Sequence, residues 1–298
     1  MSTKEHPPQQ LHVPVLLDTT LKLLAPRKGE NYLDLTAGYG GHAGRILELT
    51  ENYADSVLVD RDDFALQHLK GFAKKGTRLM HTDFASAAKT LAEEAKQFNI
   101  VLIDLGVSSP QLDMGERGFS FTKNGPLDMR MDIRQEISAE TLVNTASKDE
   151  LARIITTYGE EPLGFARRIA SAIVGARPLR TTEELARLIE QQYRGKWRRI
   201  HPATRTFQAL RIAVNDELGQ IESTLSLIPK LLKPGGRVGV ISFHSLEDRL
   251  VKRFFTEQKQ AGYEAELEIV TKKPLDGSIY DVHNPRSRSS KLRVAVKK

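Results

Sequence analysis

Four short apolar runs in the first third of the chain each end in an aspartate. These acids are Asp34, Asp60, Asp83 and Asp104, and a glycine-rich turn at residues 38–41 follows the first of them. An open parallel sheet binds its ligand outside the carboxyl ends of its strands, where these acids would gather. A row of carboxylates suits a ligand rich in hydroxyls, amines and positive charge, and it suits a polyphosphate poorly. The pattern therefore predicts a nucleoside with a cationic group, and S-adenosylmethionine is the candidate.

Individual residues around the turn refine this prediction. The spacing Gly38-x-Gly40-x-x-Ala43 satisfies the relaxed dinucleotide fingerprint, which keeps an NAD oxidoreductase open. Asp34 precedes the turn, where it would repel a pyrophosphate but suit a cationic amino acid group. Asp60 is placed to accept both ribose hydroxyls, a role that NAD enzymes share. Phe84 would pack on the adenine face while Asp83 accepts from the adenine amino group. The alternative for any single aspartate is a turn or helix cap.

Composition excludes several classes of protein. The chain has 298 residues, is 40% hydrophobic and carries a net charge of +6, which favours an anionic partner such as nucleic acid. It has no cysteine, so disulfides, cysteine-based zinc sites and a covalent cysteine route to pyrimidine carbon 5 are excluded. No apolar stretch approaches a membrane span, and residues 1–10 lack the apolar core of a signal peptide. A cytoplasmic protein without membrane contact is expected.

Strand and helix patterns alternate through the first hundred residues. Strands are predicted near residues 31–35, 56–60, 77–81 and 100–105, with helices near 62–74 and 86–97. This alternation predicts an α/β fold with a doubly wound, Rossmann-like parallel sheet. The next clear strand, 237–242, follows a turn at 233–236 and comes roughly 130 residues later, whereas one βαβ unit needs only about 30 or more. A segment is therefore inserted into the sheet domain.

The inserted segment has apolar residues at helical spacing. Thr181 and Glu184 have the pattern of a capping box and predict a helix start. We expect a discontinuous sheet domain of residues 1–111 and 216–298, closed by strands near 266–271 and 291–296. We expect residues 112–215 to form a mostly helical domain that recognises the substrate.

Six long motifs carry a more specific signal than the strand-end acids. They lie in order along the sequence at residues 104–113, 118–121, 125–132, 201–211, 241–249 and 284–289. Together they closely resemble the signatures of the bacterial 16S ribosomal RNA (cytosine-N4)-methyltransferase family. There are two departures. Leu35 stands where that family usually has Gly or Cys before a threonine, and the segment between Lys273 and Asn284 is short compared with some members.

The resemblance implies a class I methyltransferase fold with an inserted helical domain. It implies transfer of a methyl group from S-adenosylmethionine to N4 of a cytidine in the decoding region of small-subunit rRNA. The cofactor positions that carry over are Gly40, Gly41, His42, Asp60, Phe84, Asp104 and Gln111, with Asp34 as a supporting residue.

A cytosine amine is a weak nucleophile, so the reaction needs an acceptor for its N–H and in-line positioning. The acceptor is expected to be Asp104 or a group in the segment from Ser108 to Pro110, and the choice stays open. His244 is a candidate for taking the final proton, with a capping role as the alternative. The sulfonium is already activated, so no metal is expected.

Two basic clusters are candidates for binding RNA, with solvated charged loops as the alternative. They consist of Lys196, Trp197, Arg198 and Arg199, and of Arg286, Arg288 and Lys291. The expected partner is 16S rRNA within the small subunit or a late assembly particle, and a homodimer is left open. The competing functions are an RNA-binding assembly factor that keeps the fold and an N-methyltransferase acting on DNA or protein.

Overall fold

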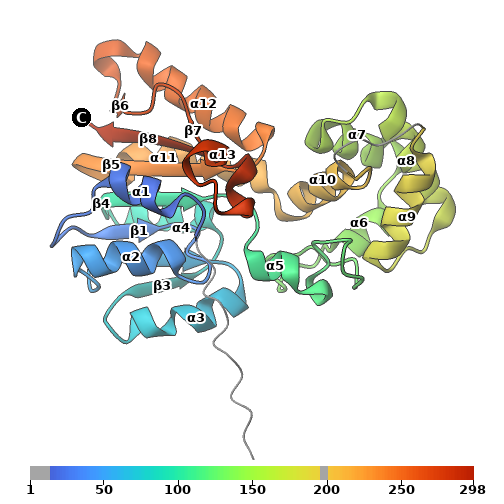
Figure 1. Cartoon of the computed structure of the whole chain (residues 1–298), viewed down its shortest axis with the longest axis horizontal. Coiled ribbons are helices and arrows are strands. Elements are labelled where there is room, and N and C mark those ends of the chain that lie inside the picture. The colour runs from blue at the N-terminus through green and yellow to red at the C-terminus, as the bar shows by residue number, and fades with distance from the viewer. Residues whose placement is uncertain (1–13, 195–200) are drawn as a thin grey trace, which may run out of the picture. The chain divides into compact units, whose positions relative to one another are not determined.

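The protein divides into two units in a computed structural model that describes residues 14–194 and 201–298 (Figure 1). The sheet unit comprises Met1–Leu105 and Ile221–Lys298, and the helical unit comprises Gly106–Gln220. The divisions expected from the sequence fell at 112 and 215. The helical unit therefore begins earlier and ends later than expected, and Gln220 Nε2 at its end donates to the carbonyl of Asn215 at 3.0 Å.

The sheet unit contains one eight-stranded sheet. Its strands are β1 (Tyr32–Asp34), β2 (Val57–Asp60), β3 (Arg78–His81), β4 (Phe98–Asp104), β5 (Leu232–Ser242), β6 (Leu267–Ile269), β7 (Leu275–Asp276) and β8 (Lys291–Lys297). They follow the order β3-β2-β1-β4-β5-β8-β6, and β7 pairs with β8. The first five strands are parallel, and β8 is antiparallel to β5. The predicted doubly wound α/β architecture is confirmed.

Helices alternate with the strands along most of the sheet unit (Figure 1). They are α1 (Leu17–Leu24), α2 (Gly41–Thr50), α3 (Asp63–Ala73), α4 (Phe84–Glu93), α11 (Glu217–Leu231), α12 (Ser245–Gln260) and the short α13 (Gly277–Tyr280). Two 3₁₀ turns, η2 (Gly262–Glu264) and η3 (Pro285–Ser289), complete the sequence of elements. The strands are rich in buried apolar side chains, as expected of a parallel sheet covered on both faces.

Two details of the sheet differ from the sequence-based expectation. The segment 233–236 lies within β5 as an irregularity: Leu232 pairs with Phe98, and Arg237 already pairs with Ile100. The extra residues between the two pairs are accommodated on one strand, so no separate turn precedes the strand. The strand β7 was not expected, because two residues are too few to show a periodic pattern.

The helical unit has its own apolar core. Its elements are α5 (Ser109–Asp113), η1 (Gly115–Arg117), α6 (Ala139–Thr145), α7 (Lys148–Gly159), α8 (Leu163–Ala176), α9 (Thr182–Gln192) and α10 (Thr204–Asn215). The predicted capping box at Thr181 is confirmed, since its side chain accepts from Glu184 N at 3.2 Å and Glu184 reaches back to Thr181 N at 2.9 Å. Leu151, Ile169 and Leu210 are among the fully buried core residues. None of the helices in the described ranges has both the length and the apolar composition that a membrane crossing requires.

Candidate active site

Three aspartates meet at the carboxyl ends of adjacent strands in the sheet unit. Asp34 ends β1, Asp60 ends β2 and Asp104 ends β4, and β1 lies between the other two strands. Asp34 is close enough to Asp104 for its charge to raise the pKa of Asp104, and Asp60 raises the pKa of Asp34 in the same way. The sheet therefore brings together three of the acids that the sequence pattern singled out.

The fourth acid, Asp83, has a different position. It is the N-cap of α4, where its carboxylate accepts from Ser86 N at 2.8 Å and from the Ser86 hydroxyl at 2.7 Å. Its neighbour Phe84 is the first residue of α4 and is buried. The helix-cap alternative thus accounts for Asp83, while the contact of Phe84 with adenine stays a prediction.

The glycine-rich turn is tied to the neighbouring strands by backbone hydrogen bonds. Leu35 N donates to Leu102 O at 3.0 Å, and Ala37 N donates to Val59 O at 2.8 Å. Gly38 N donates to the Asp60 carboxylate at 2.7 Å, which links the turn to the end of β2. Leu35, the departure from the family pattern, is buried beneath this turn.

Two glycines in the turn have no room for a side chain. Gly40 has φ +81°, and a Cβ there would lie 2.7 Å from the Phe72 ring. A Cβ on Gly41 would lie 2.4 Å from Pro14. Helix α2 begins at Gly41, so its free N–H groups point to the same edge of the sheet as the three aspartates. These N–H groups can bind the carboxylate of an amino acid group in a ligand.

Asp34 is held in a fully buried position. Tyr32 Oη donates to its carboxylate at 2.6 Å, and Thr36 N donates to it at 3.1 Å. Burial raises the pKa of Asp34 to about 7, against the lowering effect of these two hydrogen bonds, and the nearby charge of Asp60 adds to the rise. A carboxyl group in this state gains its charge most readily when a cation approaches.

Asp104 has the least compensated carboxylate of the three. Burial raises its pKa well above the ordinary value, and the charges of Asp34 and Glu247 raise it further. Its backbone N donates to Thr36 Oγ1 at 2.6 Å, and the His42 ring lies 3.7 Å from one carboxylate oxygen. The other oxygen, Oδ1, is buried and has no hydrogen-bond partner in the part of the chain that the structure describes.

This donor and acceptor set fits S-adenosylmethionine. Burial also raises the pKa of Asp60, although Asp62 N and Gly38 N donate to its carboxylate and oppose the rise. Asp34 is buried, and Asp60 and Asp104 are partly buried. Because their pKa values are raised, the three carboxylates gain stability from a ligand that brings positive charge and hydroxyl donors. The orphaned oxygen of Asp104 supplies a free acceptor at the same place.

The Asp34→Asn variant is expected to lose the pH dependence of folding stability that Asp34 causes. Because the pKa of Asp34 is about 7 in the folded state and ordinarily 3.8, the stabilisation from protonated Asp34 is fully present below pH 3.8 and is lost as the pH rises through 7. An amide does not ionise, so the variant gains stability relative to the native chain as the pH rises, by about 1.4 kcal/mol per pKa unit.

Urea unfolding of the two proteins across that pH range measures the difference. The Tyr32→Phe variant provides a second test, because it removes a hydrogen bond that lowers the pKa of Asp34. The pH at which this variant loses the stability due to protonated Asp34 should therefore be higher than in the native chain. Parallel pH profiles for native and Asp34→Asn proteins would contradict the assignment.

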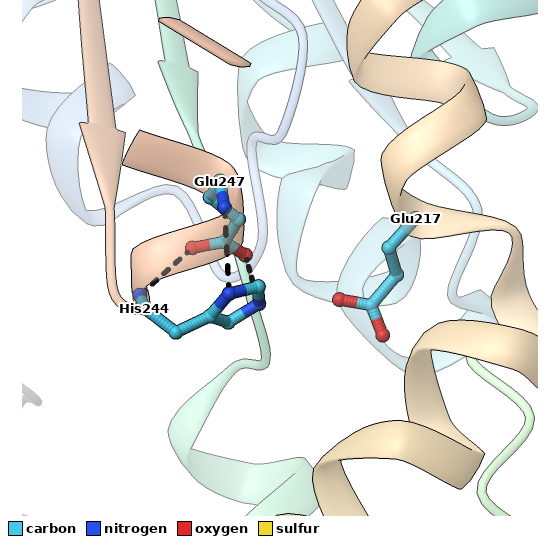
Figure 2. Close-up of side chains that lie close together, drawn as sticks. All are labelled: Glu217, His244 and Glu247. Atoms are coloured by element: carbon cyan, nitrogen blue, oxygen red, sulfur yellow. Dashed lines mark hydrogen bonds and ion pairs between the residues drawn. The ribbon is translucent and has the colours of Figure 1, made fainter. Parts of the chain in front are cut away.

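His244 lies at the N-terminus of α12 and makes its contacts with Glu247 (Figure 2). Its Nδ1 accepts from Glu247 N at 3.4 Å, and its Nε2 lies 3.1 Å from Glu247 Oε1. The Glu247 carboxylate also accepts from Phe243 N at 2.7 Å and His244 N at 3.2 Å. These contacts form the capping alternative for His244, and its role as a proton acceptor stays a prediction.

The buried Glu247 had no predicted role of its own. It lies three residues after a capping residue, which is the spacing of a capping box, but with histidine in place of serine or threonine. This local pattern is the signal by which the sequence could have revealed it.

Ser108, Pro110 and Gln111 belong to the helical unit. Ser108 is the N-cap of α5, Gln111 N donates to Ser108 Oγ at 3.4 Å, and Ser108 N donates to Gln111 Oε1 at 2.9 Å. Pro110 is within the first turn of the helix. This capping box fixes the local geometry, while the predicted contacts of these residues with cofactor or substrate stay predictions.

The structure describes the second of the two basic clusters but not the first. Lys196, Trp197, Arg198 and Arg199 lie outside the described residues. Arg286 and Arg288 lie on η3 and are exposed, and Lys291 begins β8 with its ammonium 3.4 Å from Asp248. The RNA-binding role of both clusters stays a prediction.

The family model and the sequence relatives agree on one family. The family model described as the MraW methylase family matches residues 9–298. The "Ribosomal RNA small subunit methyltransferase H" of Nitratidesulfovibrio vulgaris strain Miyazaki F is 46% identical, covering 96% of this chain and 85% of that protein. The protein of the same name from Cyanothece sp. PCC 7425 is 47% identical, covering 99% and 97%. A solved rRNA methylase from Streptococcus thermophilus aligns with 10% identity and a TM-score of 0.43, covering 96% and 98%. With the family model spanning nearly the whole sequence, this chain is a member of the MraW methylase family.

Proposed function

We propose that this protein transfers a methyl group from S-adenosylmethionine to the N4 amine of a cytidine in the decoding region of small-subunit rRNA. The observation that carries the proposal is the group of three carboxylates with raised pKa values, those of Asp34, Asp60 and Asp104, beside the glycine-rich turn in a chain of the MraW methylase family. The names of the relatives, which denote methyltransferases of small-subunit rRNA, support the substrate. The absence of cysteine in the sequence excludes the covalent route to pyrimidine carbon 5 and favours an exocyclic amine.

The chain's own residues have separate tasks in this reaction. The bound cofactor supplies a methyl group on an activated sulfonium. Asp60 accepts the ribose hydroxyls, and the N–H groups at the start of α2 hold the cofactor's carboxylate. Asp34 supplies negative charge beneath the turn. The helical unit, proposed earlier as residues 112–215, holds the rRNA.

Asp104 is the proposed acceptor for the amine N–H. Its Oδ1 has a free lone pair, and its raised pKa makes the carboxylate a stronger base than an ordinary aspartate. The amine nitrogen gains the methyl group and loses one proton, and Asp104 is placed to receive that proton. His244 is less suited to this step, because both its ring nitrogens face Glu247.

Labelled S-adenosylmethionine tests the function directly. Small subunits that lack the modification are incubated with the protein, and the rRNA is digested to nucleosides. Label is expected in N4-methylcytidine. Binding to the subunit without label would favour the assembly-factor alternative, and label in DNA or protein would favour the other N-methyltransferase. The same assay, run on small subunits and on late precursors, tests which particle is the substrate. Sedimentation tests whether the protein is a homodimer. An enzyme acting on these particles works in the cytoplasm.

A further inference from the structure

Three apolar side chains are exposed within four residues of the sheet unit. Ile279 is 69% exposed, Tyr280 is 54% exposed and Val282 is 63% exposed. They lie on α13 and in the loop after it, between β7 and β8 (Figure 1). We call Ile279, Tyr280 and Val282 the α13 patch. Single exposed apolar residues are common, but three so close together indicate a contact surface.

The α13 patch lies at the carboxyl edge of the sheet, where the three aspartates are. Lys291 of β8 pairs with Ser242, the last residue of β5, and Asp276 of β7 pairs with Lys291. The segment between Asp276 and Lys291 therefore begins and ends beside the carboxyl end of β5. Ile241 of β5 is in register with Asp104. The patch and the proposed methyl acceptor site thus share one edge of the same unit.

The patch is built on a fixed support. A Cβ on Gly277 would lie 1.9 Å from Ser287 O, so the backbones of α13 and η3 are in close contact. Gly277 N donates to Ser290 O at 2.9 Å. The Asp281 carboxylate accepts from Leu16 N at 2.7 Å and from the Ser287 hydroxyl. Exposed apolar side chains are therefore presented by a segment whose polar groups are hydrogen-bonded.

The charge around the patch is positive. Residues 272–291 contain five Lys and Arg residues and two Asp residues. Both carboxylates accept hydrogen bonds. Asp276 accepts from Ser278 N and Oγ, and Asp281 accepts from Leu16 N and the Ser287 hydroxyl. The exposed Arg286 and Arg288 lie on η3, which begins three residues after Val282 along the chain. An aromatic ring beside arginines is the arrangement that stacks unpaired bases and contacts their phosphates.

We infer that the α13 patch binds an unpaired nucleotide of the rRNA substrate, whose base stacks on Tyr280 while Arg288 contacts a neighbouring phosphate. The inference rests on the proposed function and adds a surface that selects unstacked RNA. A base that is modified at its exocyclic amine must leave its stack, and its neighbours then need a surface that receives them. Ile279 and Val282, exposed apolar neighbours of Tyr280 along the chain, add apolar surface to the site.

Binding of protein-free small-subunit rRNA by the full chain tests the inference. The Tyr280→Ala variant should bind this rRNA about 5- to 100-fold more weakly, and Tyr280→Phe should bind as the native chain does. The matched control is Tyr263→Ala: Tyr263 is fully exposed, against 54% for Tyr280, and lies on η2, where Lys298 Nζ donates to Gly262 O at the opposite edge of the sheet. The Arg288→Ala variant should reduce the slope of log affinity against log salt by about 1.

Other readouts separate the outcomes. Affinity for S-adenosylmethionine and the thermal unfolding midpoint should not change in Tyr280→Ala, while KM for small subunits rises and kcat is kept. Equal rRNA affinity in Tyr280→Ala and Tyr263→Ala would overturn the inference. Weaker binding to assembled subunits but not to protein-free rRNA would overturn it in favour of a protein partner, and a changed sedimentation coefficient would do so in favour of a second copy. The rRNA-binding readout does not depend on methyl transfer, so a failure of the proposed function is recognised separately.

Discussion

The Asp104→Asn variant is expected to methylate rRNA with a kcat about 10²- to 10³-fold below that of the native chain, at saturating cofactor and substrate. Asparagine keeps the size of the side chain but removes its charge and its ability to take a proton. The Oδ1 atom of Asp104 is buried without a hydrogen-bond partner in the described residues, so the substrate amine is its natural donor. Affinity for S-adenosylmethionine should fall by about 10- to 100-fold, since a charged hydrogen bond contributes about 1.5–3 kcal/mol.

Folding stability should show the opposite trend in this variant. Burial and the charges of Asp34 and Glu247 raise the pKa of Asp104, so its ionised form costs stability near neutral pH. Loss of that charge should leave the free energy of unfolding unchanged or raise it, a common exchange of stability for function at active sites. The matched control is Asp55→Asn, an exposed acid just before β2 at the other edge of the sheet. Native-like kcat in Asp104→Asn would remove Asp104 from the reaction.

The Gly118→Ala variant is expected to destabilise the helical unit by about 2–5 kcal/mol. Gly118 has φ +72°, and a left-handed conformation costs a residue with a Cβ about 1–2 kcal/mol. A Cβ there would also lie 2.3 Å from Pro126 O and 2.6 Å from Asp128 N, which are backbone atoms that cannot rotate away. Forcing atoms into such a site costs about 1–3 kcal/mol more.

Urea unfolding and hydrogen exchange of the α7 and α8 amides measure this loss. The matched control is Gly175→Ala in α8, where a Cβ would have open space and φ is not positive. Alanine is the better helix former, so this variant should be neutral or more stable by up to about 1 kcal/mol. A free energy of unfolding for Gly118→Ala equal to that of Gly175→Ala would show that the backbone at Gly118 adjusts without cost.

The close contact at Gly118 connects two motifs that are separate along the chain. Residues 118–121 and 125–132 are separate motifs along the chain, yet Gly118 packs directly against the backbone of Pro126 and Asp128. Asn215 then fixes the second motif to α10, since its side chain accepts from Met131 N and donates to Met129 O, both at 2.8 Å. These glycine and asparagine positions are required by close packing between segments far apart in sequence.

The strand-end aspartates show how far a local pattern reaches. Each strand's position followed from its apolar run and the acid that ends it, and the strand order then placed Asp34, Asp60 and Asp104 at one edge. The cap at Asp83 depends on Ser86, three residues away, and the same sequence rule predicts it as the alternative. The bond between Gly38 N and Asp60 joins residues 22 positions apart, and no spacing rule predicts it.

The sequence by itself determined the α/β class, the insertion, the cofactor type and, through its motifs, the family. These features depend on hydrophobic periodicity and on hydrogen bonds between residues a few positions apart, which are written directly in the order of residues. Tertiary structure alone decided which carboxylates lie close enough to raise one another's pKa values, that the pKa of Asp34 rises to about 7, and that Tyr280 is presented at the edge that holds Asp104. Burial and charge coupling depend on which distant segments meet, and β8 brings the α13 patch to the active-site edge by pairing with β5 after the chain has passed through the whole helical unit.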